Sequence, residues 1–144
     1  LPGQTAGSIA DDITLFEKMG LDMIGIGPFI PHPHTPLAKT AGGSLELALK
    51  TVALTRIATL NTNIPATTAV GTVDLQGRQK ALRCGANVLM PNVTPGQYRG
   101  LYEIYPDKIC IYEDSVAYNA SVRRMIRAIN RTVGSGYGYR KGNR

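Results

Sequence analysis

The chain has 144 residues, 43% of them hydrophobic, and a formal net charge of +6. This length allows one ordinary domain with a sizeable core. No apolar run is long enough to span a bilayer, so we expect no membrane partner, and the opening LPGQTAGS lacks the basic and apolar regions of a secretory signal.

The two cysteines, Cys84 and Cys110, are too few for a disulfide scaffold. Both lie in apolar contexts, which favours reduced core thiols in a cytoplasmic protein. The positive charge gathers at the C-terminal end, where no acid follows Ser115 and the cations are Arg123, Arg124, Arg127, Arg131, Arg140, Lys141 and Arg144. A solvated or subunit-facing basic helix explains this pattern better than a nucleic-acid interface does.

A helix is predicted near the start of the chain, where Thr5 or Ser8 can cap it and Gly20 ends it. Its apolar positions recur at helical spacing: Ile9, Ile13, Phe16 and Met19. A strand over residues 22–30 follows and breaks into a loop with four prolines. Proline fixes φ and donates no backbone hydrogen bond, so a strand cannot continue through that loop.

The next part of the chain repeats the pattern of helix and strand. Ser44 can cap a helix over residues 44–60, whose apolar side carries Leu45, Leu49, Val52 and Ile57. The elements expected after it are a strand over 63–70, a turn over 71–74, a helix over 75–85 and a strand over 86–93. Strands that are apolar on both faces indicate a parallel sheet.

The pattern changes beyond residue 94. Tyr98, Tyr102 and Tyr105 recur at helical spacing, and a short edge strand is expected over 108–113. An amphipathic helix over 121–131 has its inward side made of Val122, Met125, Ile126 and Ile129. The rest of the chain is glycine-rich and cannot build a core.

These elements predict an α/β fold, the C-terminal part of a (β/α)8 TIM barrel with a C-terminal helical extension. A barrel needs about 250 residues, and the chain begins on Leu1, so we expect a longer protein whose first half is missing. We assign 1–94 to the last βα units, 95–132 to an extension packed on the barrel, and 133–144 to a flexible basic tail.

In a barrel the functional groups gather at the C-terminal ends of the strands. Those ends are Gly25–Phe29, Ala66–Thr72 and Met90–Thr94. The glycines of the first end precede a proline and no helix, which excludes a dinucleotide fingerprint. Two adjacent threonines at the second end could bind an anion or carboxylate, and they could equally be β-branched residues that only fill space. Neighbouring residues of a strand point to opposite faces, so only one of them can point into the barrel.

For Met23 and Met90 the sequence favours a role in the core over a contact with a ligand. His32 and His34 stand two apart in the proline loop, which favours loop histidines over a metal site, because two ligands alone bind a metal weakly. The residues themselves therefore predict a small-molecule pocket and nothing more specific.

Longer strings are specific enough to suggest a family. GLDMIGIGPFIPHPHTPLA, ALTRIATLNTNIPATTAVGT and LRCGANVLMPNVTPGQYRGLYEIYPDKIC resemble the second half of the radical S-adenosylmethionine maturases of [FeFe]-hydrogenase. The resemblance covers residues 1 to about 132. It implies a radical SAM barrel that binds S-adenosylmethionine and a [4Fe-4S] cluster, and whose 5′-deoxyadenosyl radical acts on a cysteine-bound iron precursor. Other hydrogenase maturases are the implied partners.

The resemblance also implies roles for single residues. Met23 matches a position near the adenosine part of S-adenosylmethionine. Thr67 and Thr68 match a pair that binds an anion or a substrate carboxylate, while Met90, Tyr102 and Tyr105 match positions that line the substrate pocket.

Two departures from the family pattern matter. The CxxxCxxC motif that holds the cluster is absent, so the cluster belongs to the missing N-terminal half and this chain alone is expected to be inactive. Some relatives hold a second cluster on three C-terminal cysteines, but only Cys110 is present, with Tyr118 and Ser121 in the other places. One thiolate cannot hold an Fe–S cluster, so no second cluster is predicted. In addition, His34 replaces an aspartate of the loop.

Two alternatives stay open. One is another enzyme of the biotin synthase-like group, of the biotin or methylornithine synthase type, with the same fold and a different substrate. The other is a basic module that binds RNA or a protein partner through residues 123–131 and the tail.

Overall fold

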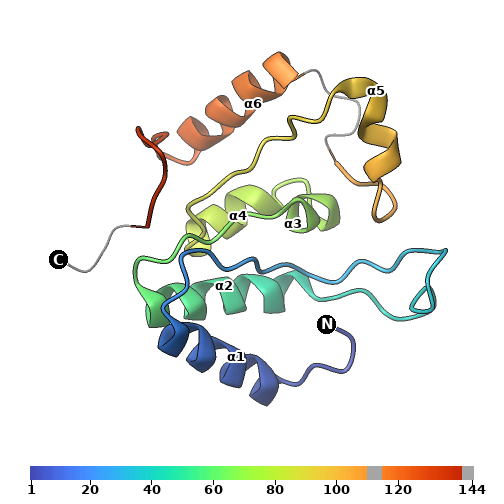
Figure 1. Ribbon diagram of the computed structural model, residues 1–144, viewed down its shortest axis with the longest axis vertical. Coiled ribbons are helices and arrows are strands. Elements are labelled where there is room, and N and C mark those ends of the chain that lie inside the picture. The colour runs from blue at the N-terminus through green and yellow to red at the C-terminus, as the bar shows by residue number, and fades with distance from the viewer. Residues whose placement is uncertain (110–114, 141–144) are drawn as a thin grey trace.

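The computed structural model describes residues 1–109 and 115–140 (Figure 1). Its helices are α1 (Ala6–Met19), α2 (Leu45–Thr59), α3 (Thr68–Val73), α4 (Gly77–Cys84), α5 (Gly96–Arg99) and α6 (Ser115–Ala128), with a 3₁₀ turn η1 (Gly100–Tyr102). Helix α2 packs between α1 and α4, and α3 packs on α4. Residues 110–113 of the predicted edge strand, and with them Cys110, lie outside the described residues.

The helix boundaries follow the capping residues of the sequence. Thr5 and Ser8 form a reciprocal capping box at the start of α1, and Gly20 ends that helix in the left-handed conformation with φ 60°. The Ser44 side chain accepts a hydrogen bond from the backbone N–H of Leu47 and so caps α2. These predicted helix starts and stops are therefore confirmed.

The predicted strands are wrong, although the parallel order of their segments is right. Residues 22–30, 63–67 and 86–91 meet only at three isolated parallel bridges, Met23–Asn63, Ile26–Ala66 and Pro65–Val88. Pro65 has no N–H to donate, which interrupts the ladder of the middle segment. Within the described residues each outer segment is bridged on one side alone, and its bridges are isolated rather than consecutive, so no regular strand is formed.

One helix, α3, was not predicted, and another, α6, begins earlier than expected. The strand predicted to reach Val70 stops at Thr67, because α3 begins at Thr68 and Asp74 closes it with a hydrogen bond to the Val70 carbonyl of 3.2 Å. Helix α6 begins at Ser115 rather than at residue 121, and its buried Tyr118 extends the inward face by one turn.

The core lies between α2, α3, α4 and the extended segments. Its fully buried side chains include Val52, Ile64 and Val70, and Met125 of α6 and Ile129 in the turn after it pack against them. Ile57 was predicted to face inward but is 70% exposed, because the buried face of α2 runs through Ala48, Val52, Thr55 and Thr59. Met19 of α1 is also exposed, contrary to the prediction.

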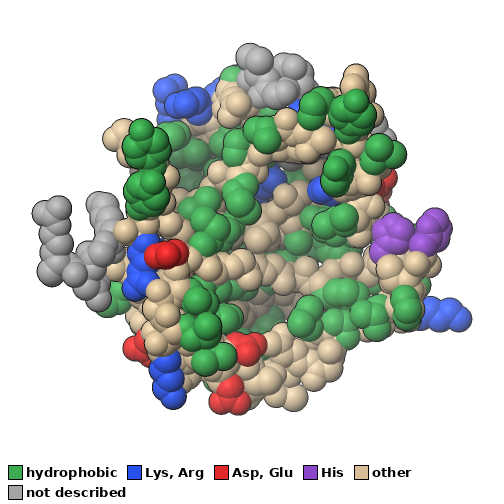
Figure 2. Space-filling model, in the orientation of Figure 1, with side chains coloured by type: hydrophobic (Ala, Val, Ile, Leu, Met, Phe, Trp, Pro, Cys, Tyr) green, Lys and Arg blue, Asp and Glu red, His purple; other side chains and the backbone are tan. Residues whose placement is uncertain are grey.

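The surface is larger than that of a closed domain. The chain exposes 9599 Å², whereas a compact monomer of this mass exposes about 7,200 Å². Figure 2 shows hydrophobic side chains spread across one face, with the two histidines together at its edge. Over the described residues no helix is both long and apolar enough to cross a membrane.

The C-terminal tail makes defined contacts that the sequence did not predict. The Asn63 side chain donates a hydrogen bond to the Gly138 carbonyl at 3.0 Å. The Arg140 guanidinium donates to the Asn61 side chain at 2.8 Å and to the Gly20 carbonyl. Arg140 therefore ties the tail to the turns that follow α1 and α2.

Candidate anion-binding site

A cavity of about 230 Å³ lies where the segments 63–67 and 86–91 end. It is lined by residues of α3, α4, η1 and α6 and of the chain between them: Thr68, Arg78, Met90, Asn92, Thr94, Tyr102, Lys108, Ile109 and Tyr118. The C-terminal ends of parallel segments are where α/β proteins place their ligands. The cavity is therefore the candidate site.

Arg78 is the buried cation of this site, with 7% of its surface exposed. Its guanidinium donates to the hydroxyl of Tyr118 and, at 3.4 Å, to the hydroxyl of Thr68. The guanidinium carbon also lies 5.8 Å from the centre of the Tyr118 ring, within the range of a cation–π contact. One side chain thus joins α4 to both α3 and α6.

The local sequence explains why an arginine reaches this position. Gly77 begins α4 directly against α3: a Cβ at Gly77 would lie 1.9 Å from the Val70 carbonyl oxygen, so only glycine allows this approach. The next residue, Arg78, shares the inward face of α4 with the buried Ala81 and Leu82. Its long side chain leads from that face to the cavity.

The turn between α3 and α4 is held by an ion pair. The Asp74 carboxylate lies 2.5 Å from the Lys80 ammonium, and it also accepts a hydrogen bond from the backbone N–H of Gln76 at 2.7 Å. The hydrogen bond from Lys80 and then that from Gln76 lower the pKa of Asp74. The pair fixes the turn that sets Arg78 beside Thr68.

The electrostatics of the cavity favour an anion. Two of its lining side chains, Arg78 and Lys108, are cationic, and none of the lining residues that the structure describes is acidic. The Lys108 ammonium donates to the Tyr102 carbonyl at 2.7 Å, which holds the charge at the cavity wall. Charge-assisted hydrogen bonds from such groups are the usual means of binding a carboxylate.

Three of the predicted site residues, Thr68, Met90 and Tyr102, meet in this cavity. Thr67 does not line it, because its hydroxyl donates to the Ile26 carbonyl at 3.4 Å and its side chain packs over Gly27. Of the threonine pair, therefore, only Thr68 lines the cavity, at the point where α3 begins.

Met23 and Tyr105 lie outside the cavity lining. Met23 bridges to Asn63, five positions before Thr68, which corresponds to about 16 Å along an extended chain. It is 48% exposed. Tyr105 follows η1 instead of continuing it, so the helical spacing of the three tyrosines does not bring them to one place.

Sequence reasoning missed Arg78, Lys108 and Tyr118. For Arg78 a signal was present, since it occupies a core position of an otherwise regular amphipathic helix, three and four residues before Ala81 and Leu82. From the sequence, Tyr118 was named only as the residue that stands in place of a cluster cysteine. Nothing in the sequence pattern brings Lys108 to this cavity.

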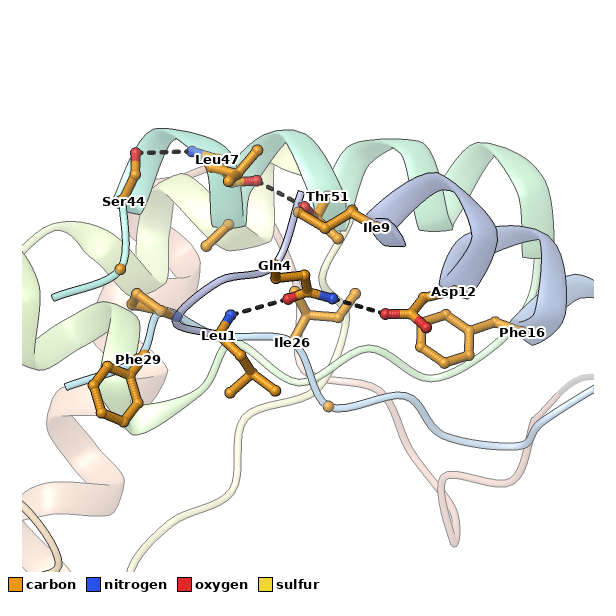
Figure 3. Close-up of a pocket in the computed structure, with 15 residues that line it drawn as sticks. Leu1, Gln4, Ile9, Asp12, Phe16, Ile26, Phe29, Ser44, Leu47 and Thr51 are labelled. Carbon is orange, nitrogen blue, oxygen red and sulfur yellow. Dashed lines mark hydrogen bonds between the residues drawn. The ribbon is translucent and has the colours of Figure 1, made fainter. Parts of the chain in front are cut away.

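A second cavity, of about 290 Å³, lies between α1, α2 and the extended segment that contains Ile26 and Phe29 (Figure 3). The Gln4 side chain spans it and donates to the Asp12 carboxylate at 2.8 Å. The histidine pair lies away from both cavities, at the tip of the proline loop, with ring centres 5.3 Å apart. Among the described residues no three His, Cys, Asp or Glu side chains are grouped to hold a metal.

Comparison with known proteins gives one strong match. The chain is 52% identical over 141 residues to the [FeFe] hydrogenase maturase subunit HydE of Thermotoga maritima. The match covers 98% of this chain and 40% of the relative, so the chain spans less than half the length of the protein it resembles. The matched region is the C-terminal part of HydE. No protein-family model matches the chain.

Proposed function

We propose that this chain, which matches the C-terminal part of HydE, is the corresponding part of a HydE-type radical S-adenosylmethionine maturase and forms the substrate-binding side of its barrel. The 52% identity over nearly the whole chain carries this proposal. The cavity at the segment ends supports it, because Thr68, Met90 and Tyr102, which the family resemblance assigns to the substrate pocket, converge there.

The barrel is part of the proposal. The bridges order the three extended segments in parallel, with 63–67 in the middle, and among the described residues nothing is bridged to the far sides of the two outer segments. The 290 Å³ cavity borders the first of these, at Gly25–Phe29, and a further cavity of about 500 Å³ borders the third, at Asn87–Leu89. Both edges have room for neighbouring strands, which the remaining part of a HydE-type protein would supply.

The [4Fe-4S] cluster does not fit this chain. Such a cluster takes four ligands, usually cysteine thiolates, and the sequence has two cysteines, of which Cys84 is half-buried on α4 beside the core. The cluster and most of the S-adenosylmethionine site therefore belong to the rest of the protein, where they supply the 5′-deoxyadenosyl radical. Met23 is the one residue that we assign to the cofactor side.

The residues of this chain bind and orient the substrate. Arg78 and Lys108 place positive charge at the cavity, and Thr68 adds a hydroxyl. We assign to this site the carboxylate of a cysteine-bound iron precursor supplied by another maturase. Met90 and Tyr102 form the apolar side of the cavity and offer contact surface to the rest of the substrate.

A second cluster has no place in this proposal. Tyr118 stands where some relatives have a cluster cysteine, and it is 6% exposed, with its ring against Arg78 and its hydroxyl bonded to the guanidinium. Ser121 next to it donates its hydroxyl to the Tyr118 carbonyl at 2.7 Å. Neither side chain offers a thiolate.

The two threonines provide the test. In the full-length protein, Thr68→Val should weaken binding of the substrate anion, while Thr67→Val should leave it unchanged, and both variants should keep the absorbance and electron paramagnetic resonance spectra of the cluster. Full-length protein without a cluster or without cleavage of S-adenosylmethionine would refute the radical-enzyme proposal. Equal effects of the two variants on substrate binding would refute the placement of the anion in this cavity.

A further inference from the structure

Arg78 joins two hydroxyl groups that come from different helices. Its two terminal nitrogens donate to the hydroxyls of Thr68 on α3 and Tyr118 on α6. Arg78 is almost fully buried, so it does not serve as a solvated surface cation. Nothing in the family resemblance assigns it a role.

The direction of the hydrogen bond to Thr68 has a chemical consequence. A guanidinium has donors only, and a hydroxyl has one proton and two lone pairs. The Thr68 oxygen that accepts from Arg78 therefore keeps its own proton for another acceptor. By contrast, the hydroxyls of Thr14, Thr51 and Thr59 donate to backbone carbonyls four residues earlier in their helices.

We propose that Arg78 is the positioning residue of the anion site: it orients the Thr68 hydroxyl as a donor toward the carboxylate of an α-amino acid substrate. This inference rests on the proposed anion site. Arg78 acts through Thr68, and its charge strengthens the hydrogen bond that Thr68 makes to the anion.

A purely structural role for Arg78 predicts a different pattern. In that case the guanidinium would serve to hold α6 by its contact with Tyr118. Tyr118→Phe then separates the two roles, because it keeps the buried ring and removes the hydroxyl that Arg78 contacts. Positioning of Thr68 predicts that this variant still binds the anion.

The experiment measures binding of S-methylcysteine, labelled with ¹³C at its carboxylate, to the full-length protein by nuclear magnetic resonance titration. This probe carries the amino-acid carboxylate without a free thiol that could bind the cluster. Wild type is compared with Arg78→Gln, Thr68→Val and the double variant. Arg83→Gln is the matched control, since it removes an exposed cation from the same helix.

We expect Arg78→Gln and Thr68→Val each to weaken binding about ten-fold, the size of one hydrogen bond to a charged group. The double variant should bind no more than about two-fold more weakly than either single variant, because coupled residues are not additive. Arg83→Gln and Tyr118→Phe should bind within about two-fold of wild type. Should Arg78→Gln not fold, Arg78→Lys takes its place, with a several-fold loss expected because an ammonium lacks the planar fork.

Other outcomes overturn the inference. Additive losses in the double variant would mean that Arg78 acts independently of Thr68. A loss in Tyr118→Phe as large as that in Arg78→Gln would assign Arg78 a structural role. If Thr68→Val loses binding while Arg78→Gln binds normally, the positioning role fails and the proposed anion site stands. If wild type does not bind the probe, the anion site falls together with this inference.

Discussion

The contact between Gly77 and Val70 sets the geometry of the site, so enlarging Gly77 is the most informative change. In Gly77→Ala the new Cβ would lie 1.9 Å from the Val70 carbonyl oxygen, whereas real Cβ contacts are essentially never shorter than 3.0 Å. Helices α3 and α4 must then separate by about 1.1 Å, the difference between these two distances. The neighbour is backbone and cannot rotate away.

Two opposing terms decide the sign. Forcing an extra methyl into a packed contact costs about 1–3 kcal/mol, while replacing glycine by alanine in a helix gains up to about 1 kcal/mol. Gly77 is the first residue of α4, and the gain is smaller there because the propensity difference applies to a helix interior. We expect a net loss of about 1–2 kcal/mol, confined to the turn between α3 and α4.

Amide hydrogen exchange of the full-length protein measures this loss locally. The N–H of Asp74, which bonds to the Val70 carbonyl, should exchange about 5- to 30-fold faster than in wild type. The separation should also lengthen the 3.4 Å hydrogen bond between Arg78 and Thr68 beyond its useful range and weaken anion binding. Gly96→Ala is the matched control, since no atom lies within 4 Å of its added Cβ. Equal exchange in Gly77→Ala and wild type would refute the contact.

Three further predictions concern other contacts. The pKa of Asp74 is lowered in the folded protein, mainly by Lys80. The stabilisation by its carboxylate is therefore complete above the pKa of the unfolded chain and is lost as the pH falls through the folded pKa. Asp74→Asn removes this carboxylate, so the stability of the turn against urea should depend less on pH in the acid range. Ser44→Ala removes the cap of α2 and should cost about 1 kcal/mol, measured by hydrogen exchange of its first turn. Arg140→Gln removes the contact with Asn61 and should speed protease cleavage of the tail without changing anion binding.

Each of these changes has a control in the same molecule. Glu46→Gln breaks the exposed ion pair with Lys50, away from the turn, and should leave the acid dependence at Asp74 unchanged. Thr14→Ala removes a hydroxyl that bonds only within its own helix, so α2 should keep its protection. Arg127→Gln removes an exposed arginine of α6 and should not change tail cleavage. The same response in a control and in its partner variant would contradict the assigned contact.

The sequence predicted α1 and α2 well because their ends are local. A cap such as Thr5 or Ser44 bonds to a backbone group only three residues away, and Gly20 ends α1 by its own backbone conformation. The extended segments were a harder problem. A strand is defined by pairing with segments distant in the sequence, which no local pattern specifies. Within the described residues the outer segments are bridged on one side alone, and Pro65 interrupts the middle one.

The position of the candidate site could be predicted from the sequence, but only some of the residues that line it could. The segment ends drew attention to Thr67, Thr68 and Met90, and the alternation of side chains predicted that one threonine would turn away. It did not predict which one, because that depends on where α3 begins. The early start of α3 at Thr68 sends Thr67 to the Ile26 carbonyl and brings Thr68 to the cavity.

Arg78 and Tyr118 show why the remaining residues could not be found by spacing. They are 40 positions apart, and their contact depends on how α6 packs on α4, which no local pattern specifies. A buried arginine is nevertheless a visible anomaly in a sequence, because a charge inside a core must be paired or bonded. In this chain two hydroxyl groups, those of Thr68 and Tyr118, accept hydrogen bonds from the guanidinium. The contact with Tyr118 is what connects the packing of α6 to the chemistry of the site.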